Sequence, residues 1–195
     1  MYSVPSFNIH NISKAIKDGY AAEWYWWYLH GLPTPEVIAF HNKTYGPDFS
    51  YEEFGPMFTA ELWQPDEWAT LFKESGAKYV VLTAKHHEGW CNWCSAEAFG
   101  WNSCENGPKR DLVGELSAAV RGVDGGGLHM GLYHSIFEWY NPLYLQDKAN
   151  NLTTSRCANI HVWHIVAVCT EFGVTLFSSD VDASAMSMRS TCLSE

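Results

Sequence analysis

Long apolar runs and basic residues are both scarce in this sequence of 195 residues. It contains no run of about 18 apolar residues, so it does not predict a membrane-spanning helix. Lys and Arg number 12 against 22 Asp and Glu, and the net charge of −10 argues against nucleic acid or an anionic membrane as a partner. Residues 1–11 have neither the basic start nor the apolar core of a signal peptide. The sequence therefore predicts neither a membrane protein nor a nucleic-acid-binding protein.

Several catalytic signatures are missing as well. There is no G-x-S-x-G elbow to support a Ser-His-Asp hydrolase. The glycines at 125–127 precede a predicted strand rather than a helix, so they indicate a turn and not a phosphate-binding loop. Cys91 and Cys94 form one C-x-x-C pair without a second, and His86 and His87 are adjacent rather than four residues apart. This pattern argues against a zinc site.

Cysteines and glycosylation sequons are compatible with the secretory pathway. The sequence has six cysteines, at positions 91, 94, 104, 157, 169 and 192, whose disulfide pairing spacing alone does not reveal. Three N-x-S/T sequons begin at Asn11, Asn42 and Asn151. Because residues 1–11 do not resemble a signal peptide, we expect the full protein to begin upstream of this sequence.

One stretch, residues 77–89, organises the chain. Tyr79–Thr83 is a short apolar run rich in β-branched residues, which is typical of a strand buried on both faces in a parallel sheet. The residues that follow it are titratable: Lys85, His86, His87 and Glu88. Such a cluster after a buried strand is typical of a site at the carboxyl edge of an α/β sheet. The alternative is a polar turn without a function.

Helical and extended patterns alternate along the chain. Helices are expected over 66–75, 111–121 and, in a weaker pattern, 159–171, and strands over 79–83, 128–135 and 174–178. Pro65 and Gly76 bound the first helix, and Asp111 is placed to cap the second. This alternation predicts an α/β fold of the TIM-like (β/α)8 barrel type, with parallel strands and long loops at their carboxyl ends. A closed barrel needs eight strands and about 250 residues. Either further strands lie within residues 1–55, or the chain is an incomplete barrel.

A heavy aromatic content points to carbohydrate. The chain has ten each of Trp, Tyr and Phe, and such rings can stack on the C–H faces of sugars. Residues 23–28 form the densest aromatic run, and they are either a packed loop or a pocket wall in which Glu23 faces ligand hydroxyls. Asp180 follows the third predicted strand and is placed to act as a nucleophile. A retaining glycosidase needs that nucleophile and a second carboxylic acid about 5–5.5 Å away.

Six stretches match the pattern of one enzyme family, and together they cover most of residues 2–148. They are YSVPSF, EWYWW, YGPDFSYEEFGPMFTAELWQPDEWATLF, GAKYVVLTAKHHEGWCNW, NGPKRDLVGELSAAVR and GLYHSIFEWYNPLYLQDK. These stretches resemble the retaining α-L-fucosidases of glycoside hydrolase family 29, their animal tissue members most closely. The resemblance implies a (β/α) barrel followed by a β-sandwich domain. It also implies a lysosomal or secreted homo-oligomeric enzyme that removes terminal α-linked L-fucose from glycoproteins and glycolipids without a metal or cofactor.

The resemblance also implies roles for individual residues. His86 and His87 are similar to the family's fucose-binding histidine pair, and Glu23 to its carboxylate that binds sugar hydroxyls. Tyr133 is similar to an aromatic residue at the end of the next strand. Trp93 is similar to a residue of the pocket wall.

The likeness weakens toward both ends of the sequence. The family's first strand ends in a His-Trp-Gly motif just before the position of Tyr2, where Met1 stands here, and residues 8–20 are extra. Asp180 stands where the nucleophile is expected, although Ser178 and Val181 replace the Trp and Gly that normally flank it.

These observations predict one domain over residues 1–195. It is a partial family 29 barrel without its first strand and C-terminal half, with a divergent segment at 150–195 and no β-sandwich domain. The general acid/base is expected beyond residue 195. The predicted function is retaining hydrolysis of α-L-fucosides, with fucosylated glycans as partners. The alternatives are a catalytically inactive fucose-binding protein and a non-functional fragment.

Overall fold

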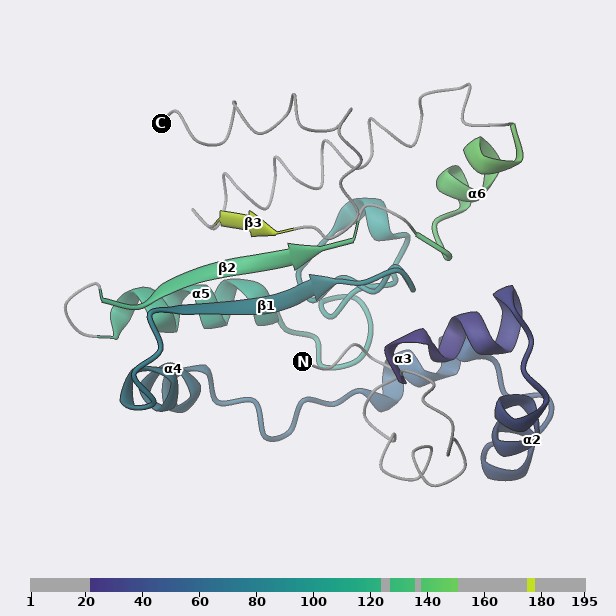
Figure 1. Cartoon of the computed structure of the whole chain (residues 1–195), viewed down its shortest axis with the longest axis horizontal. Helices are drawn as coiled ribbons and strands as arrows, with labels where there is room; N and C mark the ends of the chain where they lie inside the picture. The colour runs from purple at the N-terminus through teal and green to yellow at the C-terminus, as the bar shows by residue number, and fades with distance from the viewer. Residues whose placement is uncertain (1–21, 124–126, 136–137, 151–174, 178–195) are drawn as a thin grey trace.

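A three-stranded parallel sheet forms the centre of the protein in the computed structural model (Figure 1). The structure describes residues 22–123, 127–135, 138–150 and 175–177. The strands are β1 (Tyr79–Lys85), β2 (His129–His134) and β3 (Thr175–Phe177), in the order β1-β2-β3. The parallel arrangement and all three predicted strands are confirmed. The predicted helix over 159–171 lies outside the described residues.

The register of the sheet brings the carboxyl ends of the strands to one edge. Thr83 of β1 lies beside Tyr133 of β2, which in turn lies beside Phe177 of β3. After Thr83 the register shifts, so that Lys85 pairs with His134. The residues that follow β1 and β2 therefore emerge side by side.

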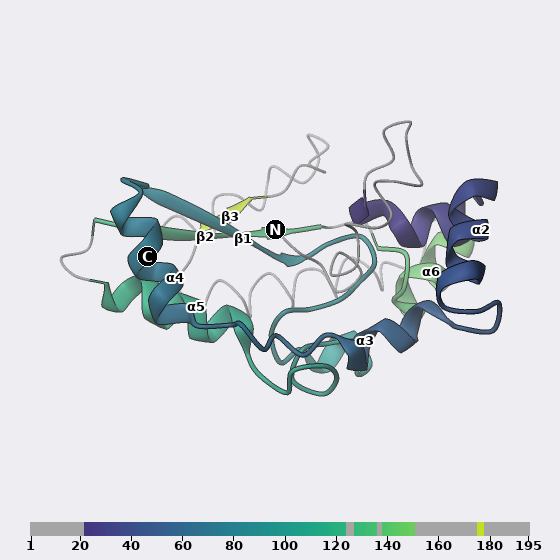
Figure 2. The ribbon, with the colours of Figure 1, turned by 90° about the horizontal axis from the view of Figure 1, so that it is seen from below.

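Helices α4 (Pro65–Glu74) and α5 (Leu112–Gly122) cover one face of the sheet (Figure 2). Both begin and end within one residue of the predicted bounds. The Asp111 side chain accepts a hydrogen bond from the backbone N–H of Gly114 at 2.8 Å, which confirms it as the N-cap of α5. Gly76 ends α4 in the left-handed conformation, with φ of +80°. Their apolar faces pack with the sheet in a core cluster of Ala69, Leu116, Ala119, Val120 and Leu128, against which Val80, Leu82 and Met130 pack.

The prediction that β1 is buried on both faces is wrong for its first half. Val80 and Leu82 are half-buried against the helices, whereas Tyr79 is 69% exposed and Val81 is 43% exposed. Successive side chains of a strand point to opposite faces, and among the described residues α4 and α5 cover only one of them. The apolar run indicated a strand correctly but did not reveal which neighbours cover it.

Short helices form a second layer beyond the carboxyl end of the sheet (Figure 1). They are η2 (Ala22–Trp24), the π-helix η3 (Trp27–Gly31), α2 (Pro35–Thr44), η4 (Tyr51–Glu53) and α3 (Phe54–Met57). Residues 23–28 are therefore helical rather than an irregular loop. The described part of residues 1–55, residues 22–55, contains no strand, so the further strands considered there are not found within it.

Aromatic side chains join this layer to the rest of the protein. Tyr25 is buried, and its hydroxyl lies 2.8 Å from His41 Nδ1 in the adjacent helix α2. Desolvation by burial raises the pKa of Tyr25, so the hydroxyl remains neutral. The surrounding cluster is built largely from aromatic rings: Tyr25, Tyr51, Phe54, Phe58, Trp90 and Trp101.

The long loop between β1 and α5 is closed by a disulfide. Cys94 and Cys104 are bonded, with their Cα atoms 5.1 Å apart, and η5 (Ala96–Ala98) lies between them. Bonded sulfurs are not available as zinc ligands. Cys91 is a buried free thiol, and the other three cysteines lie outside the described residues. No helix in the described ranges is long and apolar enough to cross a membrane.

Candidate functional site

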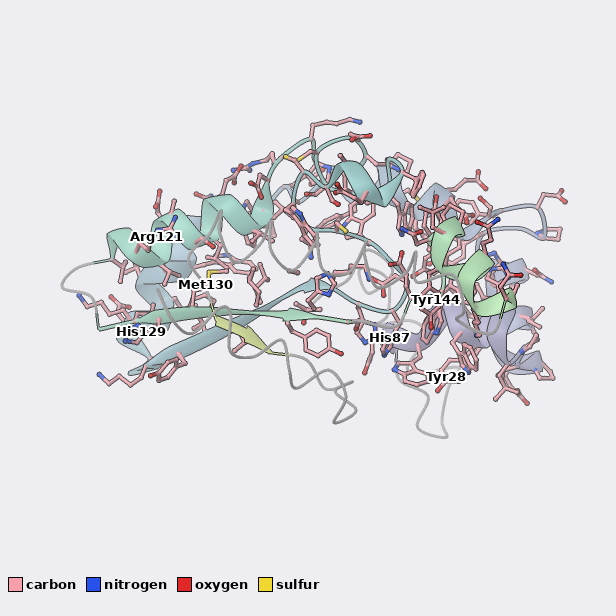
Figure 3. The ribbon with its side chains drawn as sticks, turned by 90° about the horizontal axis from the view of Figure 1, so that it is seen from above. Tyr28, His87, Arg121, His129, Met130 and Tyr144 are labelled. Atoms are coloured by element: carbon pink, nitrogen blue, oxygen red, sulfur yellow. A yellow bond between two sulfur atoms is a disulfide. The ribbon has the colours of Figure 1, made fainter. Side chains whose placement is uncertain are left out.

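The candidate site begins where β1 ends. Lys85 is the last residue of the strand, and His86, His87, Glu88 and Gly89 form the turn that follows. Figure 3 shows His87 near the carboxyl end of the sheet, at the opposite end from His129. The titratable cluster therefore lies at the sheet edge where the sequence predicted it.

The turn is held by hydrogen bonds to the carbonyl groups of His86, His87 and Glu88. Gly89 N donates to His86 O at 3.0 Å, and Trp139 N donates to His87 O at 2.7 Å. The indole Nε1 of Trp101 donates to Glu88 O at 3.0 Å. Gly89 has φ of +83°, a conformation that side chains with a Cβ rarely adopt. These constraints give the two histidines fixed positions.

Aromatic rings surround the histidine pair. The ring centroids of His86 and His87 are 4.4 Å apart, and Tyr133 at the end of β2 lies 6.0 Å from His86. Trp24 and Trp139 lie 5.8 and 5.0 Å from His87, respectively. The structure thus brings three predicted site residues, His86, His87 and Tyr133, into one cluster.

Trp139 is a member of this cluster that sequence reasoning missed. Its ring lies within 6.5 Å of five others, those of Trp24, Trp26, Trp27, His86 and His87. It joins the end of β1 to the helical layer. The only sequence signal for Trp139 was its place in the aromatic segment after β2. That signal did not distinguish Trp139 from its neighbour Tyr140.

The remaining predicted site residues have different surroundings. Glu23 is exposed and precedes Trp24, so its backbone adjoins the ring cluster. Trp93 is 3% exposed and packs in the core with Ala84 and Leu132. Asp180 lies outside the described residues.

A buried ion pair lies next to the turn, between the end of β1 and the segment after β2. Lys85 Nζ lies 2.9 Å from Glu138 Oε2, and both side chains are almost fully buried. Lys85 also donates to Ser135 O at 3.1 Å, and Glu138 Oε1 accepts from Asn141 N at 3.1 Å. Burial raises the pKa of Glu138, while the positive charge of Lys85 opposes that rise. The pair links β1 to the segment that follows β2.

Glu88 is a second buried carboxylate, and its side chain is fully enclosed. Its Oε2 lies 3.2 Å from Nδ1 of His86, which is itself slightly accessible. The histidine pair is therefore backed by a carboxylate that does not reach the surface. No group of three or more His, Cys, Asp and Glu side chains in the described part of the chain is arranged to hold a metal ion.

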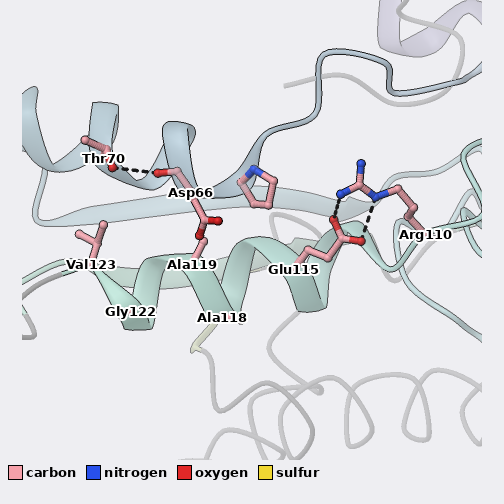
Figure 4. Close-up of a pocket in the computed structure, with 9 residues that line it drawn as sticks. Asp66, Thr70, Arg110, Glu115, Ala118, Ala119, Gly122 and Val123 are labelled. Atoms are coloured by element: carbon pink, nitrogen blue, oxygen red, sulfur yellow. Dashed lines mark hydrogen bonds and ion pairs between the residues drawn. The ribbon is translucent and has the colours of Figure 1, made fainter.

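A hollow of about 520 Å³ lies elsewhere, between α4 and α5 (Figure 4). One wall carries Asp66 and Thr70 of α4, and Ala119 belongs to α5. At one end Arg110 contacts Glu115 through two hydrogen bonds of 2.6 and 3.0 Å. The histidine cluster does not line this hollow, so it is not part of the candidate site.

Comparison with known proteins shows which family the chain belongs to. The family model described as alpha-L-fucosidase matches residues 1–191. The chain belongs to the alpha-L-fucosidase family.

Curated relatives are similar over most of this chain. Tissue alpha-L-fucosidase of Rattus norvegicus is 54% identical over 154 residues, which cover 79% of this chain and 30% of that protein. Tissue alpha-L-fucosidase of Bos taurus is 51% identical over 140 residues, covering 72% of this chain and 29% of that protein. This chain therefore spans about three tenths of the length of the curated relatives it matches.

A solved structure is similar as well. The Thermotoga maritima alpha-fucosidase in complex with fucose has a TM-score of 0.68 and 39% identity to this chain. The match covers 80% of this chain and 38% of that one. A bacterial relative from Bacteroides thetaiotaomicron has a TM-score of 0.63 at 26% identity, over 83% of this chain and 33% of that one.

Proposed function

We propose that this chain forms the fucose-binding part of an α-L-fucosidase whose catalytic domain is a (β/α) barrel. One observation carries the proposal: two histidines and Tyr133 gather with two tryptophans at the carboxyl edge of a parallel sheet. That edge is where barrel enzymes bind their substrates. Family membership indicates that the sugar is L-fucose, and the proposed substrates are terminal α-L-fucosyl groups of glycoproteins and glycolipids.

The ring cluster combines the two kinds of contact that a sugar requires. Imidazoles of His86 and His87 exchange hydrogen bonds with ring hydroxyls, and the carboxylate of Glu23 accepts from a hydroxyl. The rings of Trp24 and Trp139 offer apolar surface to the C–H face of the sugar. Hydrogen bonds that strengthen as the oxocarbenium-like transition state forms accelerate the reaction, whereas equally strong ground-state bonds only tighten binding.

We propose a retaining mechanism with Asp180 as the nucleophile. Its carboxylate attacks the anomeric carbon and forms a covalent fucosyl-enzyme while a second carboxylic acid protonates the leaving oxygen. The same acid, now ionised, then removes a proton from water, which releases fucose with retained configuration. Asp180 comes three residues after Phe177, the end of β3, and Phe177 pairs with Tyr133 in the sheet. This placement in sequence supports the assignment.

A fucose-binding protein without hydrolytic activity is the second candidate. The chain's span of about three tenths of its curated relatives favours it, because a retaining glycosidase needs two carboxyl groups across one sugar. This candidate predicts binding of L-fucose and no turnover.

Calorimetric titration with L-fucose and an assay with an aryl α-L-fucoside separate these functions. Binding with turnover supports the enzyme, binding alone supports the second candidate, and neither supports a non-functional fragment. His87→Ala should abolish binding. His129→Ala is the matched control, because His129 lies at the other end of the sheet and should leave binding unchanged.

Asp180→Asn tests the nucleophile separately. In a chain that turns over the aryl fucoside, the variant should retain L-fucose binding and lose turnover by at least about 10⁴-fold. In Asp180→Gly, which leaves room at this position, azide should restore cleavage of the aryl fucoside by attacking the anomeric carbon and expelling the aryl alcohol, which gives the β-fucosyl azide. Unchanged turnover in Asp180→Asn would remove Asp180 from the mechanism.

We further propose that the full-length protein is a homo-oligomer that follows the secretory route to the lysosome or the cell exterior. The Cys94–Cys104 disulfide supports this route, because such bonds persist mainly in oxidising compartments. Asn42 of the sequon is exposed in the last turn of α2, and the sequons at Asn11 and Asn151 lie outside the described residues. Expression in a secretory host followed by mass spectrometry should detect a glycan at Asn42 that Asn42→Gln removes.

A further inference from the structure

Glu88 is a fully buried carboxylate that the mechanism above does not use. Its Oε2 lies 3.2 Å from Nδ1 of His86, and its Oε1 has no hydrogen-bond donor among the described residues. Lys85, the nearest buried cation of this network, is already paired with Glu138 and with Ser135 O. His86 is therefore the hydrogen-bond partner that the described residues offer to the Glu88 carboxylate.

The rigidity of the turn fixes the direction of this contact. Glu88 O is held by the indole of Trp101, and the carbonyls of His86 and His87 are held by Gly89 N and Trp139 N. The turn packs closely against the segment after β2, because a Cβ at Gly89 would lie 2.5 Å from Glu138 Oε1 and 2.9 Å from Tyr140 Cβ. The Glu88 carboxylate and the His86 ring therefore face each other from fixed backbone positions only two residues apart.

The neighbours of Glu88 do not offer an alternative partner of opposite charge. Tyr51 and Cys91 lie close enough to interact electrostatically with Glu88, and burial raises the pKa of both, so they remain neutral. Glu138 is also close and carries the same sign of charge as Glu88. On its exposed side, the His86 ring faces His87 and Tyr133.

A carboxylate can only accept a hydrogen bond, so an ionised Glu88 places the proton of this contact on Nδ1 of His86. We propose that Glu88 is a positioning residue that keeps Nδ1 of His86 protonated and leaves Nε2 to bond a sugar hydroxyl. Without such a partner a neutral imidazole exchanges between two tautomers, and only one of them presents an Nε2 that accepts. The role in sugar binding rests on the proposed function, whereas the tautomer itself does not.

Nitrogen-15 NMR of the whole chain tests the tautomer directly. Long-range ¹⁵N–¹H correlation spectra of the His86 ring, assigned by their loss in His86→Asn, should give a protonated, pyrrole-type Nδ1 at every pH from about 5 to 8. His129, which stacks on Tyr79 at the far end of the sheet, provides the internal reference. An unprotonated Nδ1 in neutral His86 would overturn the proposal, whether or not the chain binds fucose.

Variants of Glu88 then distinguish a role in positioning the His86 ring from a role in folding. Glu88→Met should give mixed tautomers of His86 and weaken L-fucose binding by about tenfold. Glu88→Gln should also give mixed tautomers, because its amide can accept from a protonated Nδ1 or donate to an unprotonated one. Glu115→Gln is the control for the loss of a carboxylate, since Glu115 of α5 bonds Arg110 and Trp63. An unchanged His86 tautomer in folded Glu88→Met would contradict the proposal. Should Glu88→Met fail to fold, the spectra of the unmodified chain decide alone.

Discussion

At the scale of single residues, the site depends on groups that are unfavourable by themselves. Two buried carboxylates, Glu88 and Glu138, and a buried lysine, Lys85, lie in the turn after β1 and in the segment after β2. Each is tolerated because a specific neighbour compensates it. Substituting one partner should therefore lower the free energy of unfolding by more than the change in side-chain volume alone suggests.

Gly89→Ala tests the closest backbone approach in the turn. The left-handed conformation should cost about 1–2 kcal/mol, and the new Cβ would in addition meet Glu138 Oε1 at 2.5 Å. Gly76→Ala is the matched control, because its φ is +80° and nothing lies within 4 Å of the added Cβ. Urea denaturation should show a larger loss of unfolding free energy for Gly89→Ala than for Gly76→Ala. Equal losses would mean that the Glu138 side chain moves aside and makes room for the new Cβ.

Lys85→Met tests the buried ion pair. It leaves Glu138 uncompensated and should reduce the free energy of unfolding at neutral pH by about 3–5 kcal/mol, whereas Lys85→Met combined with Glu138→Leu should lose much less. Because burial raises the folded-state pKa of Glu138, the folded state holds its proton to higher pH than the unfolded state. Stability is therefore lost as pH rises through the folded-state pKa.

The consequence for Lys85→Met is a loss of stability that is greatest at neutral pH. It should shrink as the pH falls toward about 4.3, the unfolded value for Glu. Urea denaturation from pH 4 to 8 checks this trend. A loss that grows toward acid pH would show that Glu138 does not cause it.

At the scale of elements, the two helices on the sheet begin in different ways. Asp111 caps α5 through Gly114 N, whereas Gln64 at the start of α4 makes no side-chain cap hydrogen bond. Asp111→Ala should lower the free energy of unfolding by about 1 kcal/mol, and Asp111→Asn by much less, because asparagine is an equally good cap. Gln64→Ala should change little. Thermal denaturation of the three variants measures the difference, and equal effects of Asp111→Ala and Asp111→Asn would exclude the cap as the cause.

At the scale of the whole molecule, we expect the uncovered face of β1 to favour association between chains. Among the described residues β1 is an edge strand, with Tyr79 and Val81 exposed. Unpaired strand edges with apolar side chains favour association between chains. We expect concentration-dependent self-association in sedimentation velocity, reduced by Val81→Lys. Leu62→Lys, at an exposed leucine outside the sheet, should leave association unchanged. The reverse result would place the association surface outside the sheet.

Local sequence determined the elements of this protein and the general place of its site. Hydrophobic period, the cap at Asp111 and the stop at Gly76 act within a few residues, so the bounds of α4 and α5 could be predicted closely. His86 and His87 follow a strand, and parallel strands present their carboxyl ends at one edge. Their position near Tyr133 was therefore also predictable.

Only the tertiary structure decided which side chains face one another. Trp139 joins the histidine cluster through contacts with residues about 50 to 115 positions away in sequence, which no local pattern encodes. Trp93 has the same aromatic character but lies in the core, and Tyr79 is exposed because the helices pack on the other face of its strand. Burial and contact are properties of neighbours brought together by folding, whereas propensity and periodicity belong to the segment itself.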